Sequence, residues 1–439
     1  MAVDLVRAAL AKGASAAEAY LAEEEELVIE VRDERVEDLK IARERGIGLR
    51  VLQGQRLGFA YVTGWSPASF ARLAEEAVAN AGAASVDPYY TLPPPAVYAQ
   101  DLDLYDQQME EVPLAAKIDL ALALERAGRD YDPRVRLTES CNYEEHRFRV
   151  VLANSQGLVA AYRGSNCGLE AVLVASANGD NETGFHFQYS LKYAALNPEE
   201  VGRKAAAKAV QMLGARPITP RRVPVVMDPY VAVNFLGVLA PSFSADAVQK
   251  GRSLLADKLE QRVGGRSVNI VDDGLLPGGL ASAPFDGEGV PSRRNLLVEQ
   301  GVLRGFLHNS YTAAKAGTVS TGNAARGSFR SIPTVGTTNF YLAAGDAAPE
   351  ALLGQVSTGL YLTQVMGMHT ANPVSGDFSV GAAGCLIEHG KLTTPVRGIT
   401  VAGNILDILE AIEACGHDLT FVAGRGAPSI LVGRLTISG

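Results

Sequence analysis

Residues 365–409 read VMGMHTANPVSGDFSVGAAGCLIEHGKLTTPVRGITVAGNILDIL, a stretch in which short apolar runs alternate with turn-forming residues. One apolar run covers residues 384–387, and Glu388, His389 and Gly390 supply the turn after it. Runs of this length bounded by turn residues predict strands joined in hairpins. Comparable runs lie at residues 223–227, 296–302 and 429–437. The C-terminal half is therefore predicted to be β-rich, curved or barrel-like, with few helices.

The N-terminal half has a different pattern, in which helical stripes flank several strand candidates. Helices are predicted to begin near Leu5 and Leu114 and at the capping pairs Ser66-Pro67 and Asn197-Pro198. Strands are predicted at residues 27–31, 46–52 and 56–63, with further strands and hairpins between residues 135 and 190. The acidic run at residues 23–26 is interpreted as a solvated approach to the first strand.

Together these patterns predict an α+β fold with two domains. Residues 1–217 would form an N-terminal domain of helices packed on a twisted, mostly antiparallel sheet. Residues 218–439 would form the β-rich C-terminal domain. The boundary is placed in the segment 215–220, which contains two prolines and separates a helical pattern from a strand pattern.

Composition narrows the class of protein. The chain has 439 residues, of which 47% are hydrophobic and 20% charged, as in ordinary globular proteins. Its net charge of −9 argues against a nucleic-acid-binding surface, which needs clustered Lys and Arg. No apolar run approaches the roughly 18 residues of a membrane span, and the N-terminus does not read as a signal peptide. Four scattered cysteines without a CxxC pair predict buried, reduced thiols and a cytoplasmic location.

Two blocks carry a resemblance to a known family. They are residues 282–327, which include SAPFDGEGVPSRRNLL, and residues 365–409, with SGDFS, EHG, TPV and AGN at fitting spacings. In order and spacing these motifs resemble the TldD/PmbA family of bacterial and archaeal proteins. That family is tied to intracellular peptide degradation, and its members were once described as modulators of DNA gyrase. The resemblance implies a metalloprotease-related fold over nearly the whole chain.

The chain departs from the catalytic TldD branch of that family, in which a helix carries an HExxxH zinc site. The two nearest histidines, His369 and His389, are twenty residues apart. An alignment anchored on Lys250-Gly251 places Leu236, Gly237 and Pro241 where the motif's histidines and glutamate would stand. None of these side chains can bind zinc or act as a base. The C-terminal segment 421–427 also lacks the cysteine thought to complete that site. The resemblance therefore implies the PmbA/TldE-like branch, with no metal or other cofactor in this chain and zinc only in a TldD-like partner.

Site residues are expected from two short segments. No catalytic residue is predicted, and His369, Asp377 and His308 are the candidates if the chain performs chemistry. The same three residues, with Asn372 and Ser375, are the candidates for peptide binding. For the segment 369–377 a turn in which Asp377 bonds its own backbone is favoured over a hydrolytic cluster. For His308 a hydrogen-bonded structural role is favoured over a place in a peptide pocket.

A second pair of carboxylates lies in the glycine-rich segment Phe285-Asp286-Gly287-Glu288-Gly289. Asp286 and Glu288 could act as an acid–base pair or bind a divalent cation. The interleaved glycines favour a tight connection that leaves both carboxylates in solvent.

The function expected from the resemblance is that of a non-catalytic subunit in a cytosolic TldD/TldE-type metalloprotease acting in peptide degradation or processing. Its partners would be a TldD-like catalytic subunit, or a second copy of itself in a dimer, and extended or unfolded peptides. Nucleic acid and membrane are not expected partners. Two alternatives remain open at this point: an independent, metal-free homodimeric hydrolase, and a non-enzymatic modulator of a protein partner.

Overall fold

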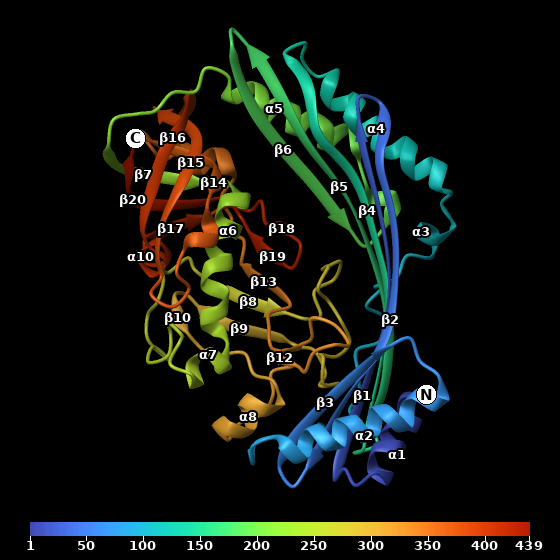
Figure 1. Cartoon of the computed structure of the whole chain (residues 1–439). Helices are drawn as coiled ribbons and strands as arrows, with labels where there is room; N and C mark the ends of the chain where they lie inside the picture. Colours follow the sequence, from blue (N-terminus) through green and yellow to red (C-terminus); the bar gives the residue numbers. More distant parts are fainter.

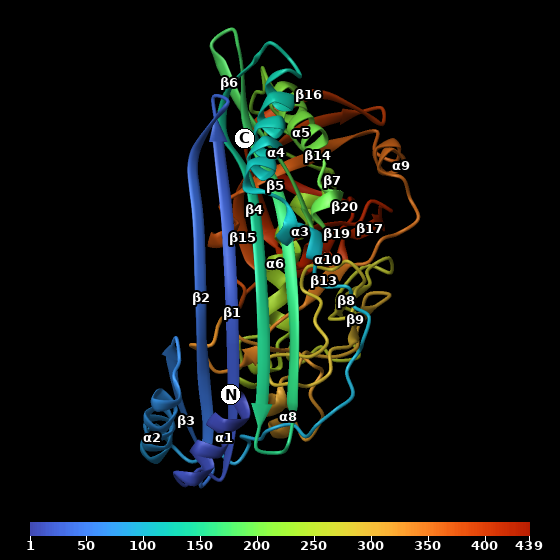
Figure 2. The same ribbon diagram turned by 90° about the vertical axis from the view of Figure 1, so that its right-hand side faces the viewer.

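The computed structural model describes the backbone of residues 1–439 and every side chain except that of Pro67. Its N-terminal part is built on one six-stranded antiparallel sheet, in the order β3-β2-β1-β4-β5-β6. The strands are β1 (Ala16–Arg32), β2 (Arg35–Gln53), β3 (Arg56–Thr63), β4 (Val135–Asn154), β5 (Val159–Ala177) and β6 (Asp180–Ser190). Figures 1 and 2 show how long and curved the central strands are.

Helices cover both ends of one face of this sheet. At one end the sheet is covered by α1 (Ala2–Ala11) and α2 (Pro67–Ala83). At the other end it is covered by α4 (Leu114–Arg129) and α5 (Pro198–Met212), and the short α3 (Gln107–Glu111) and η1 (Tyr193–Ala195) lie nearby. The odd-numbered residues of β1 explain this division. Ala17, Ala19 and Leu21 lie in the core under α1 and α2, and Leu27, Ile29 and Val31 lie in the core near α4. Glu23 and Glu25 separate the two cores.

One expectation about these strands is wrong, and two predicted strands are correct but too short. The acidic run at residues 23–26 lies inside β1, which begins at Ala16, so it does not precede the strand. The strands predicted at residues 27–31 and 46–52 are likewise parts of much longer strands, β1 and β2. The reason is cross-strand charge pairing: Glu23 and Glu25 lie opposite Arg45 and Arg43 of β2, which supports strand structure in a sequence rich in Ala and Glu.

The C-terminal part contains a closed barrel of five strands. They are β7 (Arg221–Met227), β14 (Thr358–Met366), β15 (Asp377–Glu388), β16 (Lys391–Asn404) and β20 (Ile430–Ser438), and the pairing of β16 with β20 closes the ring. The short β17 (Ile412–Cys415) adds to β20. The predicted turn at Glu388-His389-Gly390 joins β15 to β16. The expectation of a barrel-like domain is thus confirmed, and with it the α+β class.

A second six-stranded sheet lies beside the barrel, in the order β10-β9-β8-β13-β19-β18. Its strands are β8 (Ile270–Asp273), β9 (Arg294–Glu299), β10 (Val302–Leu303), β13 (Asn339–Leu342), β18 (Thr420–Val422) and β19 (Arg425–Ala427). The helix α6 (Pro229–Leu239) contributes to the core shared by the barrel and this sheet, and η2 (Ala240–Phe243) follows it. Hydrophobic periodicity does not reveal α6, because VAVNFLGVL is apolar on nearly all sides and shows no helical stripe.

Short elements complete the chain: the ribbon of β11 (Ala324–Ala325) and β12 (Thr334–Val335), and the helices α7 (Ala245–Gln249), α8 (Ser310–Ala316), α9 (Pro349–Gly354), α10 (Ile405–Glu410) and η3 (Met368–Thr370). Between α5 and β7 the chain passes through residues 213–220, where the domain boundary was placed; the boundary between residues 217 and 218 stays a prediction. None of the helices described is both long and apolar enough to cross a membrane.

Candidate functional site

A cavity of about 260 Å³ lies between the N-terminal sheet and the C-terminal domain. We call it the interdomain cavity. Its lining comes from the sheet face opposite the helices and from the C-terminal domain. The lining residues are Tyr20, Val150, Tyr162, Ala281, Ala283, residues 285–287, Ser292, residues 323–326 and residues 336–338. The even-numbered residues of β1 point to this face, because side chains alternate along a strand. Residues far apart in the sequence therefore meet here.

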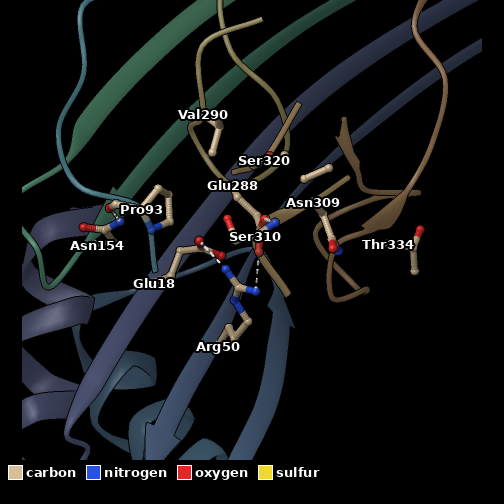
Figure 3. A network of polar contacts seen from close by, with 12 residues as sticks. Glu18, Arg50, Pro93, Asn154, Glu288, Val290, Asn309, Ser310, Ser320 and Thr334 are labelled. Carbon is tan, nitrogen blue, oxygen red and sulfur yellow. Dashed lines mark hydrogen bonds and ion pairs between the residues drawn. The ribbon is translucent and has the colours of Figure 1, made fainter. Parts of the chain in front are cut away.

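Beside this cavity, buried ion pairs connect the two parts of the chain. Arg50 of β2 donates from Nη2 to Glu18 of β1 at 2.7 Å and from Nη1 to Glu288 of the C-terminal domain at 2.8 Å. Figure 3 shows Arg50 between these two carboxylates. Glu288 also accepts a bond from the Ser310 backbone N–H at 2.8 Å. Arg326 forms an ion pair with the other oxygen of Glu18. We call Glu18, Arg50, Glu288 and Arg326 the interdomain network.

Every member of the interdomain network is almost fully buried, and its charges balance. The side chains are between 0% and 6% exposed. Burial by itself lowers the pKa of Arg50, but the charges of Glu18 and Glu288 outweigh it, so the pKa is raised and the guanidinium stays charged. Burial lowers the pKa of Arg326, against the charge of Glu18. Two carboxylates and two guanidiniums satisfy one another, so the network joins the domains and leaves no free charge for chemistry.

Asp286 shapes the loop that delivers Glu288. One of its carboxylate oxygens accepts bonds from the backbone N–H groups of Glu288 and Val290, at 2.9 and 3.0 Å, and the other accepts from Ala324 at 2.9 Å. Burial and the charge of Glu288 raise the pKa of Asp286. The expectation that Asp286 and Glu288 are solvated is wrong: they are 8% and 0% exposed, because the partner Arg50 arrives from the other domain.

A second buried carboxylate, Asp272 of β8, holds two residues that line the interdomain cavity. It accepts bonds from Asn323 at 2.6 Å and from the Thr338 backbone and hydroxyl at 2.7 and 2.9 Å. Burial raises its pKa. Asn323 and Thr338 line the cavity, together with Arg326 and Tyr20. These bonds hold the amide of Asn323 and the hydroxyl of Thr338 in fixed positions at the wall of the cavity.

The predicted cluster around His369 lies elsewhere, in an exposed turn that leads into β15, whose first residue is Asp377. His369, Asn372, Ser375 and Asp377 are all exposed. The turn itself was expected, but Asn372 makes it, by accepting bonds from the backbone N–H groups of residues 374 and 375 at 2.8 and 3.2 Å. The expected bond from Asp377 to its own backbone is wrong, because its carboxylate accepts from Asn404 at 3.0 Å.

His308 precedes α8 and is half-buried, and burial lowers its pKa. Its backbone N–H donates to the Thr321 hydroxyl at 2.7 Å. His308 does not line the interdomain cavity, and neither do the four residues of the exposed turn. Their roles in peptide binding or catalysis stay predictions. Sequence reasoning missed the lining residues Tyr20 and Arg326, since no local motif marks them.

The place where a zinc helix would stand is occupied by α6. Leu236 is buried there, Gly237 follows, and Pro241 lies in η2. A Cβ atom added to Gly237 would lie 3.2 Å from a guanidinium nitrogen of Arg425, from β19. These residues do not fit zinc, because none of the first three offers a ligand and Arg425 brings a positive charge. Among the residues described, no three His, Cys, Asp or Glu side chains form a group that could hold a metal. All four cysteines are free and buried, as predicted.

Comparison with known proteins identifies the family. Models of the PmbA/TldA metallopeptidase match as domain 1 at residues 17–81, as central domain at residues 108–213 and as C-terminal domain at residues 220–439. The chain is 30% identical to the metalloprotease PmbA of Escherichia coli O157:H7, over 98% of this chain and 94% of the relative. It is 30% identical to the metalloprotease PmbA homolog of Haemophilus influenzae, over 98% and 93%.

Solved structures agree with this assignment. A crystal structure from Thermotoga maritima, named for modulation of a DNA gyrase, superposes with a TM-score of 0.93 at 29% identity and covers 99% of both chains. TldE from Thermococcus kodakarensis superposes with a TM-score of 0.92 at 22% identity, over 100% of this chain and 99% of TldE, and so supports the fold alone. The chain belongs to the PmbA/TldD metallopeptidase family.

Proposed function

We propose that this chain is a PmbA/TldE-like subunit that binds peptide but supplies no metal, and that it acts beside a zinc-bearing TldD-like subunit in peptide degradation or processing. Two of its relatives are named metalloprotease PmbA and PmbA homolog, and one structural neighbour is named TldE. In this proposal the zinc of the assembly is held by the partner. The four buried thiols fit a reducing compartment, and we place the chain in the cytoplasm.

The observation that carries the proposal is the side-chain set at α6. Zinc activates water through about three nitrogen, oxygen or sulfur ligands and an open position. Leu236, Gly237 and Pro241 provide no such ligand, and the Arg425 guanidinium close to Gly237 would repel a divalent cation. This helix therefore serves packing: Leu236 belongs to the hydrophobic core of the C-terminal domain.

The contribution of this chain to the assembly would be a binding wall. The interdomain cavity is lined by the polar side chains of Asn323 and Thr338 and by two aromatic side chains, Tyr20 and Tyr162. Amide and hydroxyl groups can pair with the main chain of an extended peptide irrespective of its sequence. The exposed turn that holds His369 and Asp377 remains a second candidate surface for peptide.

The proposal is tested with the isolated chain first. Zinc content is measured by mass spectrometry of the purified protein, and hydrolysis of an unfolded peptide is followed with and without EDTA. A TldD-like subunit carrying HExxxH, purified in parallel, is the positive control for zinc content, and its hydrolysis alone is the baseline for the mixture of both chains. We expect less than stoichiometric zinc and no EDTA-sensitive hydrolysis for this chain alone. We expect hydrolysis when the TldD-like subunit is added, with both chains eluting together from a sizing column.

Two results would overturn the proposal. One is a stoichiometric, tightly held metal in the isolated chain. The other is failure to associate with a TldD-like subunit, combined with metal-independent hydrolysis by this chain alone, which would identify an independent hydrolase. The variant Arg425→Ala adds a control to the measurement of zinc content, because it removes the cation near Gly237. It should still bind no zinc, because it does not restore the missing ligands.

A further inference from the structure

The helix-covered face of the N-terminal sheet has a bare middle. Figure 2 shows α1 and α2 at one end and α3 and α4 at the other, with uncovered strands between them. Two rows of side chains cross this gap on neighbouring strands. The first row is Arg45 (β2), Glu23 (β1), Arg149 (β4) and Arg163 (β5); the second is Arg43, Glu25, Arg147 and Ser165 on the same strands. We call this surface the arginine saddle.

A cavity of about 520 Å³ occupies the arginine saddle. Apart from the strand segments 23–25, 43–45 and 147–149, it is lined by Tyr105 and Arg163. This volume lies within the range of about 300–1,000 Å³ that is usual for small-molecule sites. The cavity is independent of the interdomain cavity, which lies on the opposite face of the sheet.

Charges in the second row are satisfied within the protein. Glu25 pairs with Arg43 at 2.9 Å and with Arg147 at 2.6 Å. Arg147 also reaches Glu145 at 3.1 Å and Glu110 at 3.6 Å. The Arg147 side chain is only 22% exposed, so these ion pairs hold it in place. The second row therefore forms a locally neutral floor of the saddle.

The first row carries an excess of positive charge. It contains three arginines and one carboxylate, Glu23, whose nearest contact is with Arg149 at 3.8 Å. Arg149 and Arg163 lie directly opposite each other on β4 and β5, an arrangement of like charges that destabilises a sheet. Among the described side chains, Arg163 has no carboxylate within 4.0 Å, and its guanidinium instead lies 3.9 Å from the centre of the Tyr105 ring.

The side chains of the intervening even-numbered residues do not neutralise this excess, because they point to the other face. There Glu44 pairs with Arg330, and Glu24 lies 3.9 Å from His146. The saddle thus concentrates uncompensated positive charge on a chain whose net charge is −9. An anion held between Arg149 and Arg163 would remove their repulsion.

We propose that the arginine saddle binds a phosphate group, free or as the monoester of a small molecule, between Arg149 and Arg163. Guanidinium groups present planar pairs of donors that match phosphate oxygens. Stacking on Tyr105 fixes the guanidinium plane of Arg163 in advance, which reduces the entropy lost on binding. Arg45 is the third arginine of this row, and its guanidinium lies 5.3 Å from the ring of Trp65.

The test uses inorganic phosphate and AMP as probes, with adenosine as the control for the base. Binding is measured by isothermal titration calorimetry on the full chain in phosphate-free buffer. Trp65 is the only tryptophan of the chain, so its fluorescence gives a second readout next to Arg45. We expect phosphate and AMP to bind and adenosine not to bind. Sodium chloride at about 1 M should abolish binding, because the Debye length then falls to about 3 Å.

The variants Arg163→Gln and Arg149→Gln should each weaken phosphate binding about tenfold or more, since each removes charge-assisted hydrogen bonds. The matched control is Arg136→Gln, an exposed arginine of the same strand β4 outside the cavity, which should bind like the wild type. Without phosphate, Arg163→Gln should melt no lower than the wild type, because the opposed charges are gone.

Equal phosphate affinity in wild type and Arg163→Gln would overturn the proposal. So would a short DNA duplex that binds more tightly than phosphate and loses affinity in the same variants, since that would identify a surface for extended polyanions. Neither outcome depends on the metal content or hydrolytic activity of the chain, so this test is separate from that of the proposed subunit function.

Discussion

Replacing Glu288 by glutamine removes one negative charge from the interdomain network. In the native chain Glu288 faces two donors, Arg50 Nη1 and the Ser310 backbone N–H, each at 2.8 Å. A glutamine has one acceptor oxygen and one NH₂ group, so one of the two donors would meet another donor. The variant also leaves two guanidiniums, those of Arg50 and Arg326, to share the single carboxylate of Glu18.

The size of the effect follows from burial. The side chains of Glu288 and Arg50 are 1% and 6% exposed, so water cannot solvate the charge left over. Breaking a buried pair by removing one partner costs about 3–5 kcal/mol, whereas replacing both partners by apolar groups is often nearly neutral. We therefore expect Glu288→Gln to lower the free energy of unfolding by about 3–5 kcal/mol. The double variant Arg50→Met/Glu288→Gln should lose less, because Glu18 and Arg326 then remain as a balanced pair.

Urea unfolding measures both effects. Far-UV circular dichroism reports on the whole chain, and Trp65 fluorescence reports on the N-terminal domain. If the network joins the domains, the unfolding midpoints reported by the two probes should differ more in Glu288→Gln than in the wild type. A thermodynamic cycle of the single variants Glu288→Gln and Arg50→Met with the double variant should give a coupling of about 1–3 kcal/mol. A cost below about 1 kcal/mol for Glu288→Gln, or additive effects in the cycle, would refute the reasoning.

Three further predictions rest on local structure. Burial, followed by the charges of Lys208 and Lys204, lowers the pKa of His186 to about 4, from about 6.5 in the unfolded chain. The contribution of neutral His186 to stability is therefore complete above pH 6.5 and is lost as the pH falls toward 4. The urea midpoint of His186→Gln should vary less over that pH range than that of the wild type. Gly184→Ala should destabilise the protein by about 1–3 kcal/mol, because the new Cβ would lie 2.2 Å from the α5 backbone. In Gly82→Ala of α2 the new Cβ meets no atom, so this variant should stabilise the protein by about 0.5–1 kcal/mol. Urea unfolding distinguishes the two outcomes. The four thiols should react with DTNB only in denaturant, because all are buried and burial raises their pKa values, that of Cys415 to about 11.

Sequence reasoning succeeded where the signals were local. The helix α5 is an example: Asn197 was predicted to cap it, and the Asn197 side chain accepts from the Glu200 N–H at 3.1 Å. Val201, Ala205 and Ala209, which recur at helical spacing in the sequence, are buried in the core. Caps and stripes lie within one helix, so neighbouring residues are sufficient to predict them.

It failed where the deciding partner was remote. The loop of Glu288 contains no cation, so the sequence predicts a solvated carboxylate there, whereas its partner Arg50 is 238 residues away. The start of β1 was missed for a related reason. Ala and Glu favour helices or loops, and only the facing arginines of β2 and β4 make Glu23 and Glu25 suitable for a strand. The candidates around His369 lie at the turn made by Asn372, and their roles in peptide binding or catalysis stay predictions.

Charge balance separates the two groups of arginines in this chain. Arg50 and Arg326 are buried and matched one to one by Glu18 and Glu288, so adding a ligand there would break contacts that already satisfy every charge. Arg149 is 61% exposed, and its guanidinium and that of Arg163 oppose each other with too few carboxylates. A protein can remove such a repulsion by a single substitution, as Arg163→Gln would. Its presence in an otherwise acidic chain is therefore better explained by an anion that the saddle binds than by the stability of the sheet.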